Sequence, residues 1–217
     1  MRIFAAALSV KKKPHHRPAR RPRASRLDQA ERRAQLLQCA MRVFARRGLG
    51  AARHAEIAKE AGVSVPAVFF YFPTREELVT AVLDEVDHFL MKMAEDLHTT
   101  EGPAPEVLLA HARAFAASVD THPDYARVWL DWSTAIREEM WPRYLDFQER
   151  IVAVLARTIR RWQNERGAAS DVDIDDDARL MVAAAHMVAQ MKFTRVPQEK
   201  LDHFLRTLVG AALGHRI

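Results

Sequence analysis

The sequence predicts an all-α protein of about nine helices, in which a small helical head precedes a larger helical core. Three observations support this fold class. Only 7 of the 217 residues are Gly, whereas Ala, Leu, Arg and Glu, which favour helices, are plentiful. Apolar residues recur at intervals of three and four along most of the chain. Capping residues and turn glycines mark where successive helices begin and end.

Cysteine content and hydropathy restrict where the protein resides. The single cysteine, Cys39, excludes an internal disulfide and favours a reducing compartment. No apolar run reaches the ~18 residues that a membrane span needs. Residues 1–10 are apolar but precede the basic cluster, the reverse of a secretory signal, and are expected to be a disordered leader or a mis-assigned start. We therefore expect a cytoplasmic, nucleoid-associated protein with no membrane partner.

Charge is distributed unevenly along the chain. Residues 1–80 contain 17 Lys and Arg against 6 Asp and Glu, and residues 81–217 contain 16 against 22. Residues 11–27 contain eight basic residues, three prolines and no acid, so residues 1–27 are predicted to form a disordered basic arm. Such an arm suits a narrow DNA minor groove, where Arg is favoured. The alternative is a tail that only aids solubility.

The first helix is expected to begin near Asp28 and to end at Gly48. Asp28 and Glu31 have the N-cap and N3 spacing of a capping box, and Gly48 suits the position after the C-cap. Its predicted buried face comprises Ala34, Leu37, Met41 and Phe44.

A helix-turn-helix is predicted from the next segment. A second helix over about 54–61 is followed by "AGVS", where Gly62 suits a left-handed turn and Ser64 the next N-cap. Pro66 falls in the first turn of the following helix, where a missing N–H is harmless. Two short helices joined by such a turn indicate a DNA-binding domain, predicted over residues 28–75.

Four consecutive aromatic residues follow Pro66 on this third helix. At 100° per residue, one stripe faces inward and the other faces outward. The predicted inward residues are Val65, Val68, Phe69 and Phe72, and the outward residues are Pro66, Ala67, Phe70 and Tyr71. In a major groove, Phe70 would touch thymine methyls and Tyr71 would donate to a phosphate. The alternative is that Phe70 and Tyr71 pack against the next helix or the preceding loop.

The fourth helix is predicted to start at Thr74, which forms a second capping box with Glu77. Arg75 lies in its first turn, where it opposes the helix dipole unless a phosphate binds there. The helix is expected to run for about 24 residues and to connect the head with a core domain over residues 76–217. Its apolar positions are Leu78, Val82, Val86, Phe89, Met93 and Leu97.

Further helices are predicted over 105–119, 123–136, 141–166, 174–195 and 198–213. Five Asp in residues 171–177 are explained by the start of a helix, because the glycine and terminal Glu of a calcium loop are absent. No metal site and no cofactor are predicted. The last two helices have apolar stripes suited to a four-helix dimer interface, or to the internal core. The predicted interface residues are Leu180, Ala184, Met187, Met191, Leu201, Leu205, Leu208 and Leu213.

Trp129 and Trp132, three residues apart, share one helix face. They either pack in a filled core or form the wall of a ligand pocket, and periodicity does not separate the two. The pocket interpretation adds Phe89, Met93, Phe115 and Met187.

Residues 54–79, "HAEIAKEAGVSVPAVFFYFPTREELV", resemble the helix-turn-helix of TetR-family transcription regulators. "FARRGLGAARHAEIA", "FPTREELV" and "VWLDWSTAIREEMWP" are similar to the LuxR/HapR-type branch, the quorum-sensing master regulators of vibrios. "RRPRASRL" resembles the basic arm of that branch. The resemblance covers roughly residues 17–215.

The resemblance implies a homodimeric repressor or activator that binds a double-stranded DNA operator. It also implies that the last two helices form the dimer bundle, and that a core pocket accepts an apolar small-molecule effector. The residues expected to contact DNA, on this basis and from the helical pattern, are Arg21, Arg23, Arg26, Arg53, Ser64, Pro66, Ala67, Phe70, Tyr71, Thr74 and Arg75.

One position departs from the vibrio pattern. Those regulators have Asn where this chain has Phe70, so the preferred operator should differ. An enzyme is disfavoured, because no phosphate-binding Gly loop, two-His zinc helix or nucleophile elbow is present. The remaining alternative is a helical adaptor or sensor of the same fold without strong operator specificity.

Overall fold

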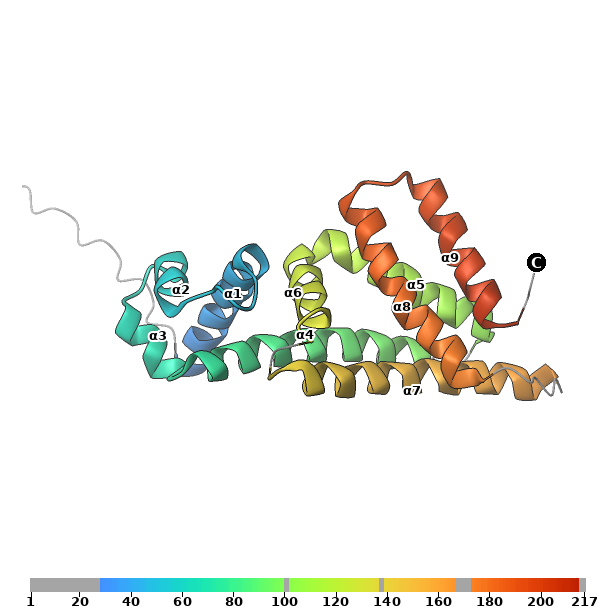
Figure 1. Cartoon of the computed structure of the whole chain (residues 1–217), viewed down its shortest axis with the longest axis horizontal. Helices are drawn as coiled ribbons and strands as arrows, with labels where there is room; N and C mark the ends of the chain where they lie inside the picture. Colours follow the sequence, from blue (N-terminus) through green and yellow to red (C-terminus); the bar gives the residue numbers. More distant parts are fainter. Residues whose placement is uncertain (1–27, 100–101, 137–138, 167–172, 215–217) are drawn as a thin grey trace, which may run out of the picture.

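The computed structural model describes residues 28–99, 102–136, 139–166 and 173–214, and within these residues it contains nine α-helices. The molecule is elongated, with the head at one end and the helical core at the other (Figure 1). The helices are α1 (Gln29–Arg47), α2 (His54–Ala61), α3 (Val65–Tyr71), α4 (Arg75–His98), α5 (Ala104–Thr121), α6 (Pro123–Ser133), α7 (Trp141–Arg166), α8 (Ile174–Phe193) and α9 (Gln198–Ala212).

Local capping signals are confirmed at the first helix and only in part at the fourth. Asp28 Oδ1 accepts from the Glu31 N–H at 2.7 Å, and Glu31 Oε2 accepts from the Asp28 N–H at 2.9 Å. Thr74 Oγ1 accepts from the Glu77 N–H at 3.1 Å, which is one half of the predicted capping box. Ser64 occupies the N-cap of α3 without a side-chain cap bond. The helices therefore begin at the predicted N-cap residues, even where only part of the capping hydrogen bonding forms.

The head is formed by α1, α2 and α3, with the first turns of α4 (Figure 1). Gly62 has φ 66° and ψ 33°, the left-handed conformation predicted for the turn between α2 and α3. In α1 the buried face contains Leu37, Met41 and Phe44 as predicted, but Ala34 is exposed, and Leu36, two positions further on, is buried instead.

The core is arranged around two long helices, α4 and α7, which lie side by side (Figure 1). Helix α5 packs on α4, α7, α8 and α9, and α6 packs on α1 and α4. Trp132 of α6 is fully buried, and its Nε1 donates to the Met140 carbonyl at 3.1 Å. Helix α6 is therefore held by the core while it packs on α1 of the head, so it links the two parts in addition to α4.

Ion pairs join α4 to α7 along the outer surface of the core. Arg143 pairs with Asp84, and Arg150 contacts Asp87 at 2.5 Å. Within the described part of the chain, no helix is both long and apolar enough to cross a lipid bilayer.

Candidate nucleic-acid interface and core cavity

Helix α3 is fixed to the head by Val68 and Phe72, whose side chains are 0% and 1% exposed. The prediction that Phe69 and Val65 also face inward is wrong, because they are 45% and 37% exposed. The buried imidazole of His54 occupies the space beneath α3. It stacks on the Phe69 ring at 4.1 Å, and its Nε2 lies 2.8 Å from the Phe72 carbonyl oxygen. A histidine from α2 therefore completes the small core that the helical spacing assigned to Phe69.

Phe70 is the most exposed large apolar side chain described, at 69% of its surface. Its ring meets Tyr71 edge-on at 5.0 Å, without packing into the core. The alternative that Phe70 packs against α4 or the preceding loop is therefore excluded. Tyr71 is half-buried against the core, so it is only partly outward. An apolar aromatic side chain thus stands free at the C-terminal part of α3.

Arg75 has a partner within the chain. Its Nη2 donates to the Leu49 carbonyl, and the guanidinium is half-buried. The loop after α1 passes beside the first turn of α4, so a backbone carbonyl satisfies the cation where a phosphate was predicted. Arg has five N–H donors, so one bond to Leu49 leaves others available.

The predicted DNA-contact residues divide into three groups. Arg53, Ser64, Pro66 and Thr74 are exposed on the head, and Ala67 is half-buried. The arm residues Arg21, Arg23 and Arg26 lie outside the described residues. The third group consists of Phe70, Tyr71 and Arg75.

Several other basic residues of the head are already paired. Arg42 and Arg46 both bond to Glu60, at 2.9 and 2.8 Å, and Arg47 bonds to Glu56 at 2.8 Å. The hydrogen bonds from Arg42 and Arg46 lower the pKa of the Glu60 carboxyl. These ion pairs join α1 to α2. The three paired arginines are therefore less available to bind phosphates than the exposed Arg53.

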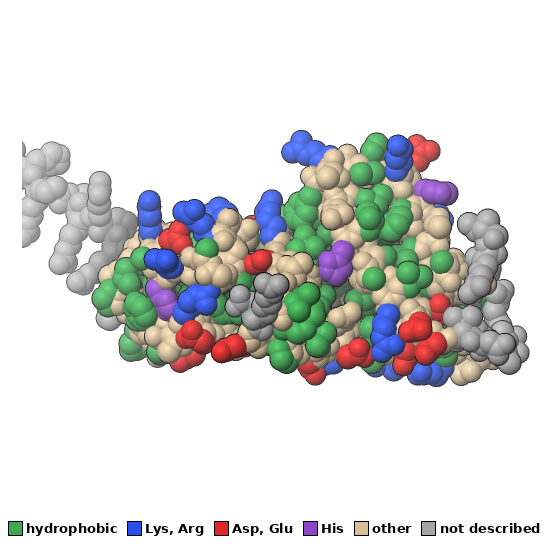
Figure 2. Space-filling model, viewed as in Figure 1, with side chains coloured by type: hydrophobic (Ala, Val, Ile, Leu, Met, Phe, Trp, Pro, Cys, Tyr) green, Lys and Arg blue, Asp and Glu red, His purple; other side chains and the backbone are tan. Residues whose placement is uncertain are grey.

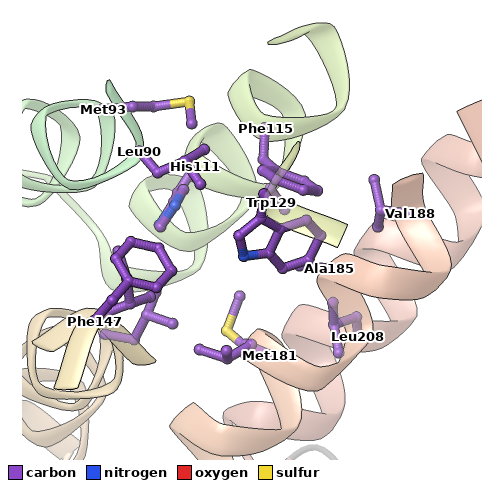
Figure 3. A pocket seen from close by; sticks show the side chains of 14 residues that line it. Leu90, Met93, His111, Phe115, Trp129, Phe147, Met181, Ala185, Val188 and Leu208 are labelled. Carbon is purple, nitrogen blue, oxygen red and sulfur yellow. The ribbon is translucent and has the colours of Figure 1, made fainter. Parts of the chain in front are cut away.

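A cavity of about 70 Å³ lies in the core between α4, α5, α6, α7, α8 and α9 (Figure 3). Met93, Phe115 and Trp129 line it, as the pocket interpretation predicted. Sequence reasoning missed His111, Phe147 and Met181. The signal for Phe147 was present, because it begins an i, i+4, i+8 stripe with Ile151 and Leu155 on α7. No sequence signal distinguished His111.

Three predicted pocket residues lie outside this cavity. Phe89 packs instead against the His122 and Tyr125 rings, at 4.9 and 4.8 Å. Trp132 is turned toward Phe147 on α7, at 5.5 Å. Met187 is 48% exposed on the outer side of α8. Helical spacing placed these residues on apolar faces but did not specify which neighbour each face meets.

The predicted dimer residues also divide. Leu180 is 47% exposed, and Ala184 and Met191 are half-buried. The prediction is wrong for Leu201, Leu205 and Leu208, which are buried within their own chain. Helix α9 packs on α5 and α8, so its leucine stripe faces the core of the same subunit. Figure 2 shows hydrophobic side chains over the part of the surface occupied by α8 and α9.

Comparison with known proteins decides the family. Residues 36–82 match the family model described as "Bacterial regulatory proteins, tetR family". The chain is 35% identical over 200 residues to the HTH-type transcriptional regulator LuxR of Vibrio harveyi, covering 90% of this chain and 93% of LuxR. The chain belongs to the TetR family. It is a DNA-binding transcriptional regulator rather than an enzyme.

Solved TetR-family structures share the fold. The CifR cysteine mutant, complexed with 26-base-pair operator DNA, superposes with a TM-score of 0.69 at 22% identity, over 88% of this chain and 98% of CifR. Bacillus subtilis FadR, in complex with stearoyl-CoA, superposes with a TM-score of 0.69 at 16% identity, over 85% of this chain and 99% of FadR. At these identities the structures establish the fold alone. In the described part of the chain, no cluster of three or more His, Cys, Asp or Glu side chains could hold a metal ion.

Proposed function

We propose that this TetR-family regulator acts as a homodimer in the nucleoid, binds operator DNA through α3 and the basic arm, and responds to a small apolar effector. The free Phe70 side chain on a helix that the head holds rigidly is the observation that carries the proposal. The DNA complex of CifR supports the same use of this fold. The similarity to LuxR supports a role in quorum sensing.

Salt dependence tests DNA binding directly. Each neutralised phosphate contributes about −0.9 to the slope of log affinity against log salt. A dimer that engages two heads and two arms is expected to give a slope of about −4 or steeper, and deletion of residues 1–27 should make the slope shallower. Fluorescence anisotropy with labelled operator at several salt concentrations measures the slope for the full-length protein and for the protein without residues 1–27. The adaptor alternative, without operator specificity, predicts equal weak binding to every duplex.

Replacing Phe70 with Asn is expected to change which operator is preferred without abolishing binding. An exposed Phe makes apolar contact with a thymine methyl, whereas Asn bonds adenine bidentately. Discrimination at one base pair should change by about 1–3 kcal/mol. Selection from a randomised operator library measures this change in base preference. Ile136→Asn is the control, because Ile136 is another exposed apolar residue, at 65%. An equal loss on all sequences would contradict base reading by this residue.

Effector binding is proposed for the core cavity. An engineered cavity of about 150 Å³ admits benzene, so a cavity of about 70 Å³ must widen to take a molecule of that size. Met93 and Met181 in its wall have flexible side chains that permit widening. The stearoyl-CoA complex of FadR supports effector binding within this fold.

Helix α6 provides a route from cavity to head. Trp129 of α6 lines the cavity. On the same helix, the Tyr125 hydroxyl donates to Glu85 of α4 at 3.0 Å and accepts from Gln38 of α1 at 3.2 Å. Asp131 accepts from the Leu49 N–H at 2.5 Å. A shift of α6 on ligand binding would therefore move α1 and the start of α4, and with them α3.

A further inference from the structure

The cavity wall is apolar except at two side chains, His111 of α5 and Trp129 of α6. Within the described chain, neither the Trp129 Nε1 nor the His111 Nε2 has a hydrogen-bond partner, and each retains some accessible surface. Figure 3 shows the His111 imidazole and the nitrogen-bearing edge of the Trp129 indole turned toward the same open space beside Phe147 and Met181. The His111 and Trp129 side chains therefore give one region of an otherwise apolar cavity the ability to form hydrogen bonds.

A hydrogen-bonded chain behind His111 fixes its orientation. His111 Nδ1 lies 2.9 Å from His98 Nε2, and His98 Nδ1 lies 2.7 Å from the Thr158 hydroxyl oxygen. Thr158 is 3% exposed, and the described residues offer its hydroxyl proton no acceptor other than His98 Nδ1. A buried hydroxyl without an acceptor would cost about 1–3 kcal/mol, so Thr158 donates to His98.

The direction of the hydrogen bond from Thr158 to His98 determines which nitrogen of each imidazole carries the proton. Because His98 Nδ1 accepts from Thr158, its proton is on Nε2, which donates to His111 Nδ1. The proton of His111 is then on Nε2, the nitrogen that remains free. The indole of Trp129 is a donor only. Both free polar groups of the cavity are therefore N–H donors, and both require an acceptor.

Both imidazoles are neutral at physiological pH. Burial, followed by the proximity of the titratable His111 and of the cationic Arg157 and Arg161, lowers the pKa of His98 to about 3. Burial lowers the pKa of His111 to about 4. A carboxylate in this space would face two neutral donors and no imidazolium, and its burial would be costly. A neutral oxygen acceptor avoids that cost.

We propose that His111, held by His98 and Thr158, and the indole of Trp129 together bind the single oxygen acceptor of an otherwise apolar, uncharged effector. This inference rests on the proposed effector function and specifies its ligand class. Carbonyl compounds, such as ketones, esters and amides, provide such an oxygen. Thr158 and His98 are positioning residues, since they act through His111 and do not line the cavity.

Three small probes of similar size distinguish the ligand classes. Acetophenone carries one carbonyl oxygen, ethylbenzene carries none, and benzoate carries an anionic carboxylate. The full-length protein, with ¹⁵N-labelled Trp and His, is titrated with each probe and followed by NMR. The Trp129 indole signal is assigned by its loss in Trp129→Phe. Acetophenone is expected to shift the Trp129 indole N–H and the His111 Nε2–H downfield, whereas ethylbenzene is expected to bind without that shift and benzoate not to bind.

Two variants test the contribution of each donor. Trp129→Phe and His111→Leu are each expected to weaken acetophenone binding about two- to tenfold more than ethylbenzene binding, the effect of one lost hydrogen bond. The matched controls are His88→Leu, at an exposed histidine on α4, and Trp141→Phe, outside the cavity. Both should leave the affinities for acetophenone and for ethylbenzene unchanged. If His111→Leu does not fold, Trp129→Phe still measures the effect.

The outcomes separate the two proposals. Equal weakening of both neutral probes, no downfield shift with acetophenone, or tighter binding of benzoate than of acetophenone would overturn the assigned acceptor class and leave the effector cavity intact. If none of the three probes bound, both the acceptor assignment and the effector cavity would be overturned, and DNA binding by the head would be unaffected.

Discussion

Replacing Met187 with Glu is expected to dissociate the dimer and to lower operator affinity by about 100-fold or more. Met187 is 48% exposed on α8, which also presents Leu180 at 47% and Phe193 at 37%. A large apolar surface on one helix marks an interaction site, and two-fold symmetry would bring the two introduced carboxylates close together. Burying an unpaired charge there costs several kcal/mol. Single heads then bind separately, without the affinity of two joined half-sites.

Sedimentation velocity and fluorescence anisotropy measure the two effects on the same samples. Leu145→Glu is the matched control, because Leu145 has a similar exposure, 42%, but lies on a different helix, α7. The control should remain dimeric and bind the operator normally. A Met187→Glu protein that sediments as a dimer would show that another surface joins the subunits.

Replacing Asp131 with Ala is expected to lower the free energy of unfolding by about 1.5–3 kcal/mol, the range for a hydrogen bond to a charged group. Asp131 Oδ2 accepts from the Leu49 N–H at 2.5 Å, and Leu49 is 4% exposed. Without the carboxylate, that buried N–H has no acceptor. The Leu49 carbonyl, in turn, accepts from Arg75, so the same peptide segment joins α6 to the start of α4.

Urea unfolding of three variants tests this junction. Asp131→Asn retains an acceptor oxygen and should lose less stability than Asp131→Ala. Asp146→Ala removes a carboxylate whose side chain is 72% exposed and should lose at most about 0.5 kcal/mol. Equal losses for Asp131→Ala and Asp146→Ala would show that the bond to Leu49 contributes little. If the α6 route operates, Asp131→Ala should also weaken the effect of a cavity ligand on operator affinity.

Local sequence predicted the helices well because their signals act over a few residues. The capping box at Asp28, the left-handed Gly62 and the proline at the start of α3 each determine backbone geometry within one turn. The fifth to ninth helices were predicted to within three residues at either end. These signals do not depend on which surface a helix packs against.

The site was predicted less completely, for one physical reason. Phe69 and Leu205 both lie on apolar stripes at helical spacing, yet Phe69 is exposed and Leu205 is fully buried. His54 replaced Phe69 in the small core, and α5 and α8 covered the leucine stripe of α9. Periodicity identifies an apolar face, but the neighbour of that face comes from distant parts of the chain.

The sequence by itself determined the all-helical class, the helix-turn-helix and the exposed aromatic residue at Phe70, because short-range hydrogen bonding and helical spacing suffice for these. The tertiary structure alone decided three further features: the pairing of Arg75 with Leu49, the inward turn of Leu201, Leu205 and Leu208, and the approach of His98, His111 and Thr158. Each requires side chains separated by many residues to pack at one place, and that packing depends on how whole helices fit together.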